Sequence, residues 1–206
     1  MKNIPLPHPL RHLAGLLALL LALIPLPASA EKIVLQLNWY HQFQFAGYYA
    51  AVEQGYYRKA GLDVAISEVS PGTDPVINVI SGKAAFGIAS SDLLISRTQG
   101  QPVVALAAIL QHSPAAFFSR QRAKPGLNEL TGKRMMLDPM SNELHAWLKK
   151  EGLPVERFTQ LDPSYDPQDL IRGRTDIMSG SLLNEAWFLE HAGFAYTALQ
   201  PISAGI

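Results

Sequence analysis

The chain after residue 30 alternates short apolar runs with segments whose apolar residues recur at helical spacing, and this alternation constrains the fold most. Residues 32–37 (KIVLQL) have the composition of a strand. Apolar and aromatic residues then recur three or four positions apart over residues 45–56, which indicates a helix. Further strands are expected at 62–69, 85–89 and 103–110, the last two buried, and then at 115–119, 134–137, 158–161, 176–179 and 195–199.

Repeated strand–helix units predict an α/β fold with mostly parallel sheets and helices on both sheet faces. Two such series meet near residues 111–116, which predicts two lobes, 31–115 and 116–206, joined by a crossover. Ligands of open α/β sheets bind beyond the carboxyl ends of the strands. Between two lobes we therefore expect an interdomain ligand-binding cleft.

Two helix starts are marked by capping residues. Asp74 precedes Pro75, which suits the first position of a helix, and Ser141 precedes a second amphipathic segment. The expected inward-facing residues are Val76, Val79 and Ile80 in the first helix, and Leu144, Trp147 and Leu148 in the second.

The first 30 residues have the order of a secretory signal peptide. Lys2 and Arg11 supply positive charge, residues 13–24 are apolar apart from glycine, and Ala28-Ser29-Ala30 gives a small-residue cleavage pattern. A membrane anchor is the alternative, but this run is short beside the ~20 residues that span a bilayer. We expect a mature, periplasmic chain that begins near Glu31.

Composition excludes several classes of function. Without residues 1–30, 15 of the 17 basic residues remain against 17 acidic ones, because only Lys2 and Arg11 are lost. A near-neutral chain without a basic stripe does not favour a nucleic-acid partner. The absence of cysteine excludes disulfides, thiolate zinc sites and a cysteine nucleophile. No G-x-S-x-G or H-E-x-x-H motif is present, so neither a catalytic residue nor a metal is expected.

Several long blocks resemble one known family. The stretch that begins at Leu35, LQLNWYHQFQFAGYYAAVEQGYYRKAGLDV, is similar to the opening of the NMT1/THI5-like family, near its aliphatic sulfonate and thiamine-precursor binding proteins. The blocks SGKAAFGIASSDLLISRTQGQPVVALAAILQHSP, LTGKRMMLDP, DPQDLIRGRTDIMSGSLLNE and FLEHAGFAY continue the resemblance in the same order. The resemblance implies a type 2 periplasmic-binding fold.

The resembled family has three functional branches. One branch delivers thiamine pyrimidine precursors to ABC permeases, and another is a fungal-type synthase that makes the pyrimidine from pyridoxal phosphate and its own histidine. A third branch is fused through a transmembrane helix to histidine kinase or diguanylate cyclase modules, and HQFQFAGYYAA and ASSDLL are most similar to it. Family members continue beyond the segment that matches residues 203–206, so the resemblance implies that the second lobe is incomplete here.

The synthase branch can be tested residue by residue. Its cofactor lysine matches Ala89, and its consumed histidine matches Leu93. Alanine forms no Schiff base and leucine donates no imidazole. Its iron-linked cysteine motif has no counterpart in a chain without cysteine. The resemblance therefore favours a binding protein that uses no cofactor, with the thiamine pyrimidine (HMP-phosphate) synthase as the alternative.

Candidate ligand-binding residues of the first lobe begin at the end of the first strand. Asn38 and Trp39 lie there, and Trp39 offers a flat ring and an N–H donor, with a core tryptophan as the alternative. Phe43 is expected to line a pocket for a planar ligand. Gly47 permits close approach of a backbone or ligand at the helix start, and Tyr48 is a candidate contact whose commoner role is helix packing.

A second group follows the strand predicted at 85–89. The hydroxyls and free backbone N–H groups of Ser90, Ser91 and Asp92 are expected to face the cleft. Ordinary helix capping is the alternative. His112 lies at the predicted crossover, where a hinge or cleft-wall role competes with a purely structural one.

The second lobe contributes three more candidates. Ser141 lies in the segment 139–142, which resembles the place where the synthase branch holds phosphate, but the neighbouring Asp138 would repel an anion. Asn184 and Glu185 follow the strand predicted at 176–179, and a carboxylate there can accept hydrogen bonds from an aminopyrimidine or a cationic amine. A helix-start glutamate favoured by the helix dipole is the alternative.

The sequence therefore predicts non-catalytic capture of a small, planar, nitrogen-containing solute that resembles a thiamine pyrimidine precursor. The expected partner is an ABC permease or, in a sensor, a transmembrane kinase or diguanylate cyclase module.

Overall fold

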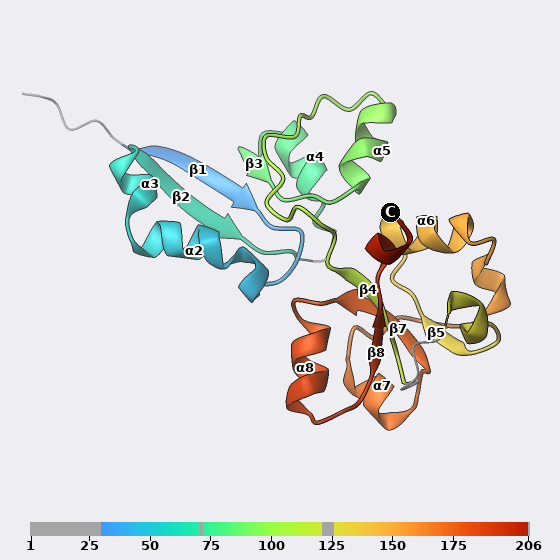
Figure 1. The fold of residues 1–206 in the computed structure, drawn as a ribbon. Coiled ribbons are helices and arrows are strands. Elements are labelled where there is room, and N and C mark those ends of the chain that lie inside the picture. The colour runs from blue at the N-terminus through green and yellow to red at the C-terminus, as the bar shows by residue number, and fades with distance from the viewer. Residues whose placement is uncertain (1–29, 71, 121–125, 206) are drawn as a thin grey trace, which may run out of the picture.

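Two separate β-sheets organise the chain, as a computed structural model shows for residues 30–70, 72–120 and 126–205 (Figure 1). The predicted signal peptide lies outside these residues apart from Ala30. The first sheet has the order β2-β1-β3 and is parallel throughout; its strands are β1 (Glu31–Gln36), β2 (Leu62–Ser67) and β3 (Phe86–Gly87). The second sheet has the order β6-β5-β7-β4-β8; its strands are β4 (Ala115–Ser119), β5 (Arg134–Met136), β6 (Thr159–Leu161), β7 (Ile177–Ser181) and β8 (Thr197–Leu199).

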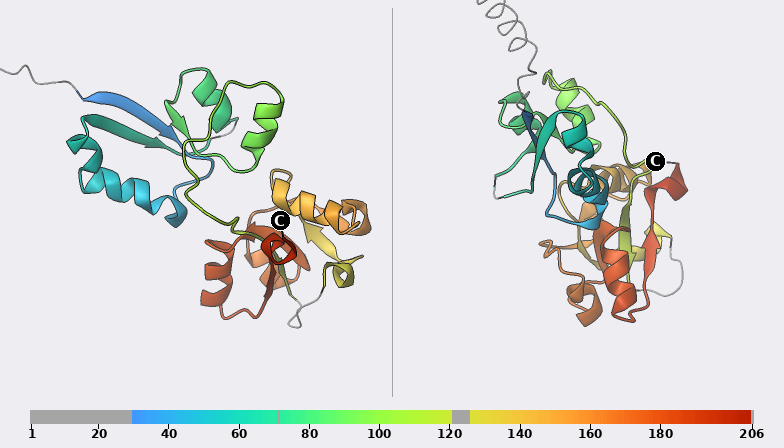
Figure 2. Two further views of the ribbon diagram at one scale, coloured as in Figure 1. Left: turned by 45° about the horizontal axis from the view of Figure 1, so that its top comes forward. Right: turned by 90° about the vertical axis from the view of Figure 1, so that its left-hand side faces the viewer.

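Short helices connect the strands, and the segment between α5 and β4 runs from the first sheet to the second (Figure 2). The first sheet is accompanied by η1 (Phe43–Phe45), α2 (Ala46–Glu53), α3 (Tyr56–Lys59), α4 (Pro75–Ile80) and α5 (Asp92–Thr98). The second sheet is accompanied by η2 (Leu127–Leu130), α6 (Asn142–Lys150), η3 (Val155–Arg157), α7 (Gln168–Arg172), α8 (Glu185–His191) and η4 (Pro201–Ala204). The α/β alternation predicted from the sequence is confirmed.

The second sheet is covered on both faces. Phe117 and Phe118 are neighbours in β4, and because side chains alternate along a strand they enter different cores. Phe117 packs with the α6 residues Leu144, Trp147 and Leu148, which are all buried as predicted. Phe118 packs in a second cluster with residues of α7 and α8. β4 runs antiparallel to β7 and β8, whereas β5 is parallel to β6 and β7.

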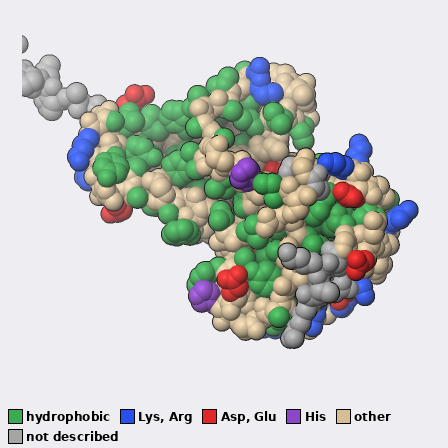
Figure 3. Space-filling model, viewed as in Figure 1, with side chains coloured by type: hydrophobic (Ala, Val, Ile, Leu, Met, Phe, Trp, Pro, Cys, Tyr) green, Lys and Arg blue, Asp and Glu red, His purple; other side chains and the backbone are tan. Residues whose placement is uncertain are grey.

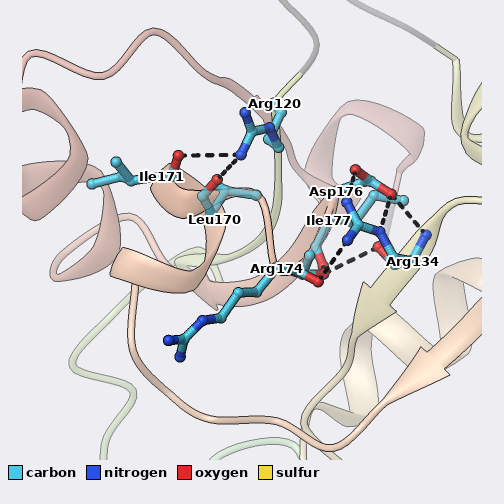
Figure 4. Close-up of polar contacts among 8 residues, drawn as sticks. Arg120, Arg134, Leu170, Ile171, Arg174, Asp176 and Ile177 are labelled. Atoms are coloured by element: carbon cyan, nitrogen blue, oxygen red, sulfur yellow. Dashed lines mark hydrogen bonds and ion pairs between the residues drawn. The ribbon is translucent and has the colours of Figure 1, made fainter.

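A polar cluster fixes the amino ends of β5 and β7 (Figure 4). The guanidinium of Arg134 donates to both carboxylate oxygens of Asp176, at 3.0 and 2.8 Å. The hydroxyl of Thr175 donates to the carbonyl of Arg134 at 3.1 Å. Arg120, which follows β4, donates to the carbonyl of Leu170 in α7 at 2.6 Å. These bonds join the amino ends of β5 and β7, and they tie the carboxyl end of the antiparallel strand β4 to α7.

The first sheet has a smaller core. Leu35, Leu37 and Phe45 are buried between β1 and the helix start, and Tyr48 is packed against them. Asp74 caps α4 as predicted, because its Oδ1 accepts hydrogen bonds from the backbone N–H groups of Val76 and Ile77 at 2.8 and 3.1 Å.

The prediction of a buried strand at 103–110 is wrong. No strand forms there, and Val103 is the one buried residue of the segment, while Leu106 is 72% exposed. An apolar run becomes a strand only when a neighbouring strand satisfies its backbone groups, and in the described part of the chain β3 has only β1 beside it. Hydrophobic patches accordingly reach the surface over the first-sheet elements (Figure 3).

Two smaller expectations about the first lobe also fail. The strand predicted at 85–89 forms only at Phe86–Gly87, and both residues are exposed rather than buried, because β3 is an edge strand. In α4, Val76 is buried but Val79 is half-buried and Ile80 exposed, since little of the described chain packs against the end of this helix.

Among the described residues, no helix has both the length and the apolar character needed to cross a membrane.

Candidate functional site

The loops at the carboxyl ends of β1 and β6 meet through two aromatic rings. Trp39 follows β1, and Tyr165 follows β6 in the loop before α7. Their ring centroids are 5.5 Å apart and the ring planes cross at 64°, an edge-to-face contact. In Figure 1 the arrowheads of β1 and β2 point toward the second sheet. The contact therefore lies where ligands of α/β sheets bind, beyond the carboxyl ends of the strands.

A carboxylate stands beside this aromatic pair. Asp138 follows β5, and its Oδ1 accepts hydrogen bonds from the backbone N–H of Met140 at 3.0 Å and from the hydroxyl of Tyr165 at 3.3 Å. Its own backbone N–H donates to Oγ of Ser179 in β7 at 2.8 Å. Burial raises the pKa of the Tyr165 hydroxyl, and the negative charge of Asp138 raises it further. The hydroxyl therefore stays protonated and can donate.

Tyr165 has an unusual backbone conformation. Its φ of 57° is the only positive value among the described residues other than glycine. A residue with a Cβ adopts the left-handed region at a steric cost of about 1–2 kcal/mol. The surrounding turn holds Tyr165 in this conformation, since Asp166 N–H donates to Ser164 Oγ at 3.2 Å and Gln168 N–H donates to Asp166 Oδ1 at 2.9 Å.

The loop that carries Trp39 is tied to the end of β2. Glu68 Oε2 accepts a hydrogen bond from the backbone N–H of His41 at 3.0 Å and lies 3.5 Å from Nε2 of its ring. The other ring nitrogen, Nδ1, contacts the hydroxyl of Tyr49 in α2. Burial, with a smaller contribution from Glu68, raises the pKa of Tyr49. These contacts limit the freedom of the loop and so help to place Trp39.

The other candidates near β1 differ in their surroundings. Asn38 is half-buried, and its Oδ1 has no hydrogen-bond partner among the described residues. Phe43 is 84% exposed. A Cβ placed on Gly47 would have no atom within 4 Å, so no backbone approach requires glycine there. Tyr48 packs on the core of the first sheet.

In the serine-rich segment before α5, the carboxylate of Asp92 accepts hydrogen bonds from its neighbour Ser90. Asp92 Oδ1 accepts hydrogen bonds from both the backbone N–H and the hydroxyl of Ser90, each at 2.8 Å. The hydroxyl of Ser91 is buried, and no hydrogen bond to it occurs in the described structure. His112 is exposed in the connection between the sheets.

In the second lobe the predicted polar residues stabilise helix starts. The carbonyl of Ser141 accepts hydrogen bonds from Leu144 and His145 N–H, both at 3.1 Å. Glu185 Oε2 accepts from Ser181 N–H at 2.5 Å, and its Oε1 accepts from the Asn184 side-chain amide at 2.8 Å. This arrangement matches the alternative in which Glu185 is a helix-start glutamate that stabilises the start of α8. No hydrogen bond or ring contact of the described residues joins Glu185 or Ser90 to Trp39.

Sequence reasoning missed Tyr165 and undervalued Asp138. The segment 163–167 (P-S-Y-D-P) has the composition of a turn, and no candidate residue was placed in it. An aromatic residue inside a turn directly after a strand was the available signal, because such a turn lies at the ligand-binding edge of the sheet.

Two surface hollows lie elsewhere: one of about 260 Å³ beside α3 and β2, lined in part by Glu53 and Arg58, and one of about 100 Å³ beside Arg120 and Lys133. The described residues include no group of histidine and acidic side chains placed to hold a metal.

Residues 42–206 match the family described as NMT1/THI5 like. The chain belongs to this family. It is 25% identical over 186 residues to the formylaminopyrimidine-binding protein of Halalkalibacterium halodurans, a match that covers 86% of this chain and 56% of that protein. It is 28% identical to the riboflavin-binding protein RibY of Chloroflexus aurantiacus, over 51% of this chain and 31% of RibY. This chain thus spans about half or less of the length of these relatives.

Solved structures with a similar fold are periplasmic binding proteins. The sulfonate-binding protein SsuA of Methylobacillus flagellatus superposes with a TM-score of 0.58 at 20% identity, over 82% of this chain and 56% of that one. SsuA of Xanthomonas axonopodis pv. citri, solved with MOPS, gives 0.58 at 15% identity, over 85% and 61%. The predicted family and the α/β periplasmic-binding fold are confirmed.

Proposed function

We propose that this protein captures a small, planar, nitrogen-containing solute between two lobes and releases it unchanged. The contact of Trp39 with Tyr165 carries the proposal, because it brings two aromatic rings from different sheets to the carboxyl ends of their strands. Aromatic rings bind planar solutes through offset or edge-to-face packing. The division into lobes 31–115 and 116–206 is part of the proposal.

The named relatives support this class of solute. One binds a formylaminopyrimidine and another binds riboflavin, and both ligands contain flat, nitrogen-rich rings. Closure of the two lobes around the solute is the mechanical event that we infer. Capture takes place in the periplasm after removal of a signal peptide near Ala30, and the closed form docks on an ABC permease. In a sensor, the same closure would act on a membrane-linked kinase or cyclase module.

Synthesis of the pyrimidine is the second candidate. The chain is 32% identical over 83 residues to 4-amino-5-hydroxymethyl-2-methylpyrimidine phosphate synthase THI11 of Saccharomyces cerevisiae, over 40% of this chain and 24% of that enzyme. Ala89 and Leu93 stand at the positions that match the cofactor lysine and the consumed histidine. Neither side chain can perform the required chemistry, so we favour binding without catalysis.

A thermal-shift screen followed by calorimetry tests the proposal on the full chain. Aminopyrimidines, flavins, sulfonates and amines are added separately, and the proposal expects an aromatic nitrogen heterocycle to raise the melting temperature by mass action. Mass spectrometry of the released solute should find it unchanged. A pyrimidine product formed from pyridoxal phosphate and iron would overturn the proposal, as would a screen in which no heterocycle binds.

A further inference from the structure

We infer that Asp138 selects the charge of the solute, so that the site accepts an uncharged or cationic ring with N–H donors and rejects sulfonates and phosphate esters. This inference rests on the proposed function and adds the substrate class to it. It depends on the place of Asp138 in the fold, on its hydrogen bonds and on the absence of Asp138 from the ion pairs of the described residues.

Asp138 is placed to meet the solute. It follows β5, at the same sheet edge as Tyr165, and its side chain is half-buried. Tyr165 links the two proposed contacts, because its hydroxyl bonds to Asp138 while its ring packs against Trp39. A solute resting against these rings therefore lies close to the carboxylate.

The carboxylate of Asp138 can accept further hydrogen bonds from a ligand. Both hydrogen bonds that the described residues donate to it end on Oδ1. Oδ2 accepts none from them, and an ionised carboxylate can only accept. An exocyclic amino group, a protonated ring nitrogen or an amine supplies the matching donor, and a hydrogen bond to an ionised acceptor is among the stronger kinds.

The charge of Asp138 is not neutralised within the described structure. The described ion pairs join His41 to Glu68, Arg134 to Asp176 and Arg174 to Asp169, and none includes Asp138. Arg134 begins β5, at the opposite end of the strand from Asp138. An anionic solute would therefore meet a like charge that forms no ion pair with a described arginine or lysine, which opposes its binding.

Calorimetry with three solutes tests the inference: 4-amino-5-hydroxymethyl-2-methylpyrimidine, its phosphate ester as the matched anion, and MOPS as a sulfonate. We expect the full wild-type chain to bind the free pyrimidine at least about tenfold more tightly than either anion. Asp138→Asn keeps an oxygen for Met140 and Tyr165 but removes the charge, so the preference should shrink to about threefold or less. Asp162→Asn removes an exposed charge from the loop after β6 and should leave the preference intact.

Tyr165→Phe provides a second variant, because it keeps the carboxylate and should keep the discrimination against anions even if overall affinity falls. The inference is overturned if the wild type binds an anion as tightly as the free pyrimidine, or if Asp138→Asn preserves the full preference. If no ring compound binds the wild type at all, the proposed function itself fails, and the inference fails with it.

Discussion

The ring of Trp39, which follows β1, meets the ring of Tyr165, which follows β6, with their centroids 5.5 Å apart. Among the described ring contacts, this one joins the two sheets. The two residues are far apart in the sequence, so the contact forms only when both lobes have folded. It places an aromatic pair, with the Asp138 carboxylate hydrogen-bonded to the Tyr165 hydroxyl, at the carboxyl ends of the strands, where α/β sheets generally bind ligands.

Replacement of Trp39 by alanine should weaken solute binding by about tenfold or more, because the flat face for the ring is lost. Trp187→Ala is the matched control: Trp187 is 58% exposed and stacks on His191 within α8, and no described ring contact joins it to Trp39 or Tyr165. Calorimetric titration of both variants measures the effect. Equal affinities for the two variants would show that Trp39 does not touch the solute.

Tyr165→Asn should separate binding from folding. Asparagine tolerates the left-handed backbone that Tyr165 adopts, so the melting temperature should stay the same or rise slightly. The ring and the hydroxyl are lost, so affinity should fall by about tenfold. Tyr56→Asn removes a similarly exposed tyrosine from the start of α3 and should leave affinity unchanged. A Tyr165→Asn protein that binds normally contradicts the assignment.

The misjudged segment 103–110 provides a stability test. Leu106→Ala should change the free energy of unfolding by no more than about 0.5 kcal/mol, because Leu106 lies at the surface. Leu148→Ala removes a buried side chain from α6 and should cost about 2–5 kcal/mol. Denaturant unfolding compares the two. A cost at Leu106 that equals the cost at Leu148 would indicate a buried strand after all.

Local patterns predicted most elements because local physics determines them. The helical stripe of Leu144, Trp147 and Leu148 is buried as expected, and Asp74 caps α4 through bonds within two and three residues. The run 103–110 failed because an apolar run does not reveal whether a partner strand will lie beside it. The contact between Trp39 and Tyr165 was not predicted, because it depends on how two lobes dock and on one unusual backbone conformation.

The pair of Arg134 and Asp176 should make stability depend on acid pH. Hydrogen bonds from Arg134 lower the pKa of Asp176 below its ordinary value of 3.8. A carboxyl group whose pKa is lower in the folded than in the unfolded chain stabilises the fold fully above its unfolded pKa, and the stabilisation is lost as pH falls through the folded value. Asp176→Asn should therefore melt below the wild type at neutral pH, and the two melting temperatures should converge below pH 3.8.

Thermal melts of both proteins across this range measure the effect, with Asp162→Asn as a control that removes an exposed carboxylate. A difference between wild type and Asp176→Asn that stays constant into acid would contradict the role of the ion pair.

Fluorescence of a protein that keeps Trp39 alone tests most directly whether the solute binds where the two sheets meet. Trp147→Phe and Trp187→Phe remove the other two tryptophans. Titration with 4-amino-5-hydroxymethyl-2-methylpyrimidine should then change the emission saturably, with the dissociation constant that calorimetry gives. Binding seen by calorimetry without any change in Trp39 emission would place the solute elsewhere.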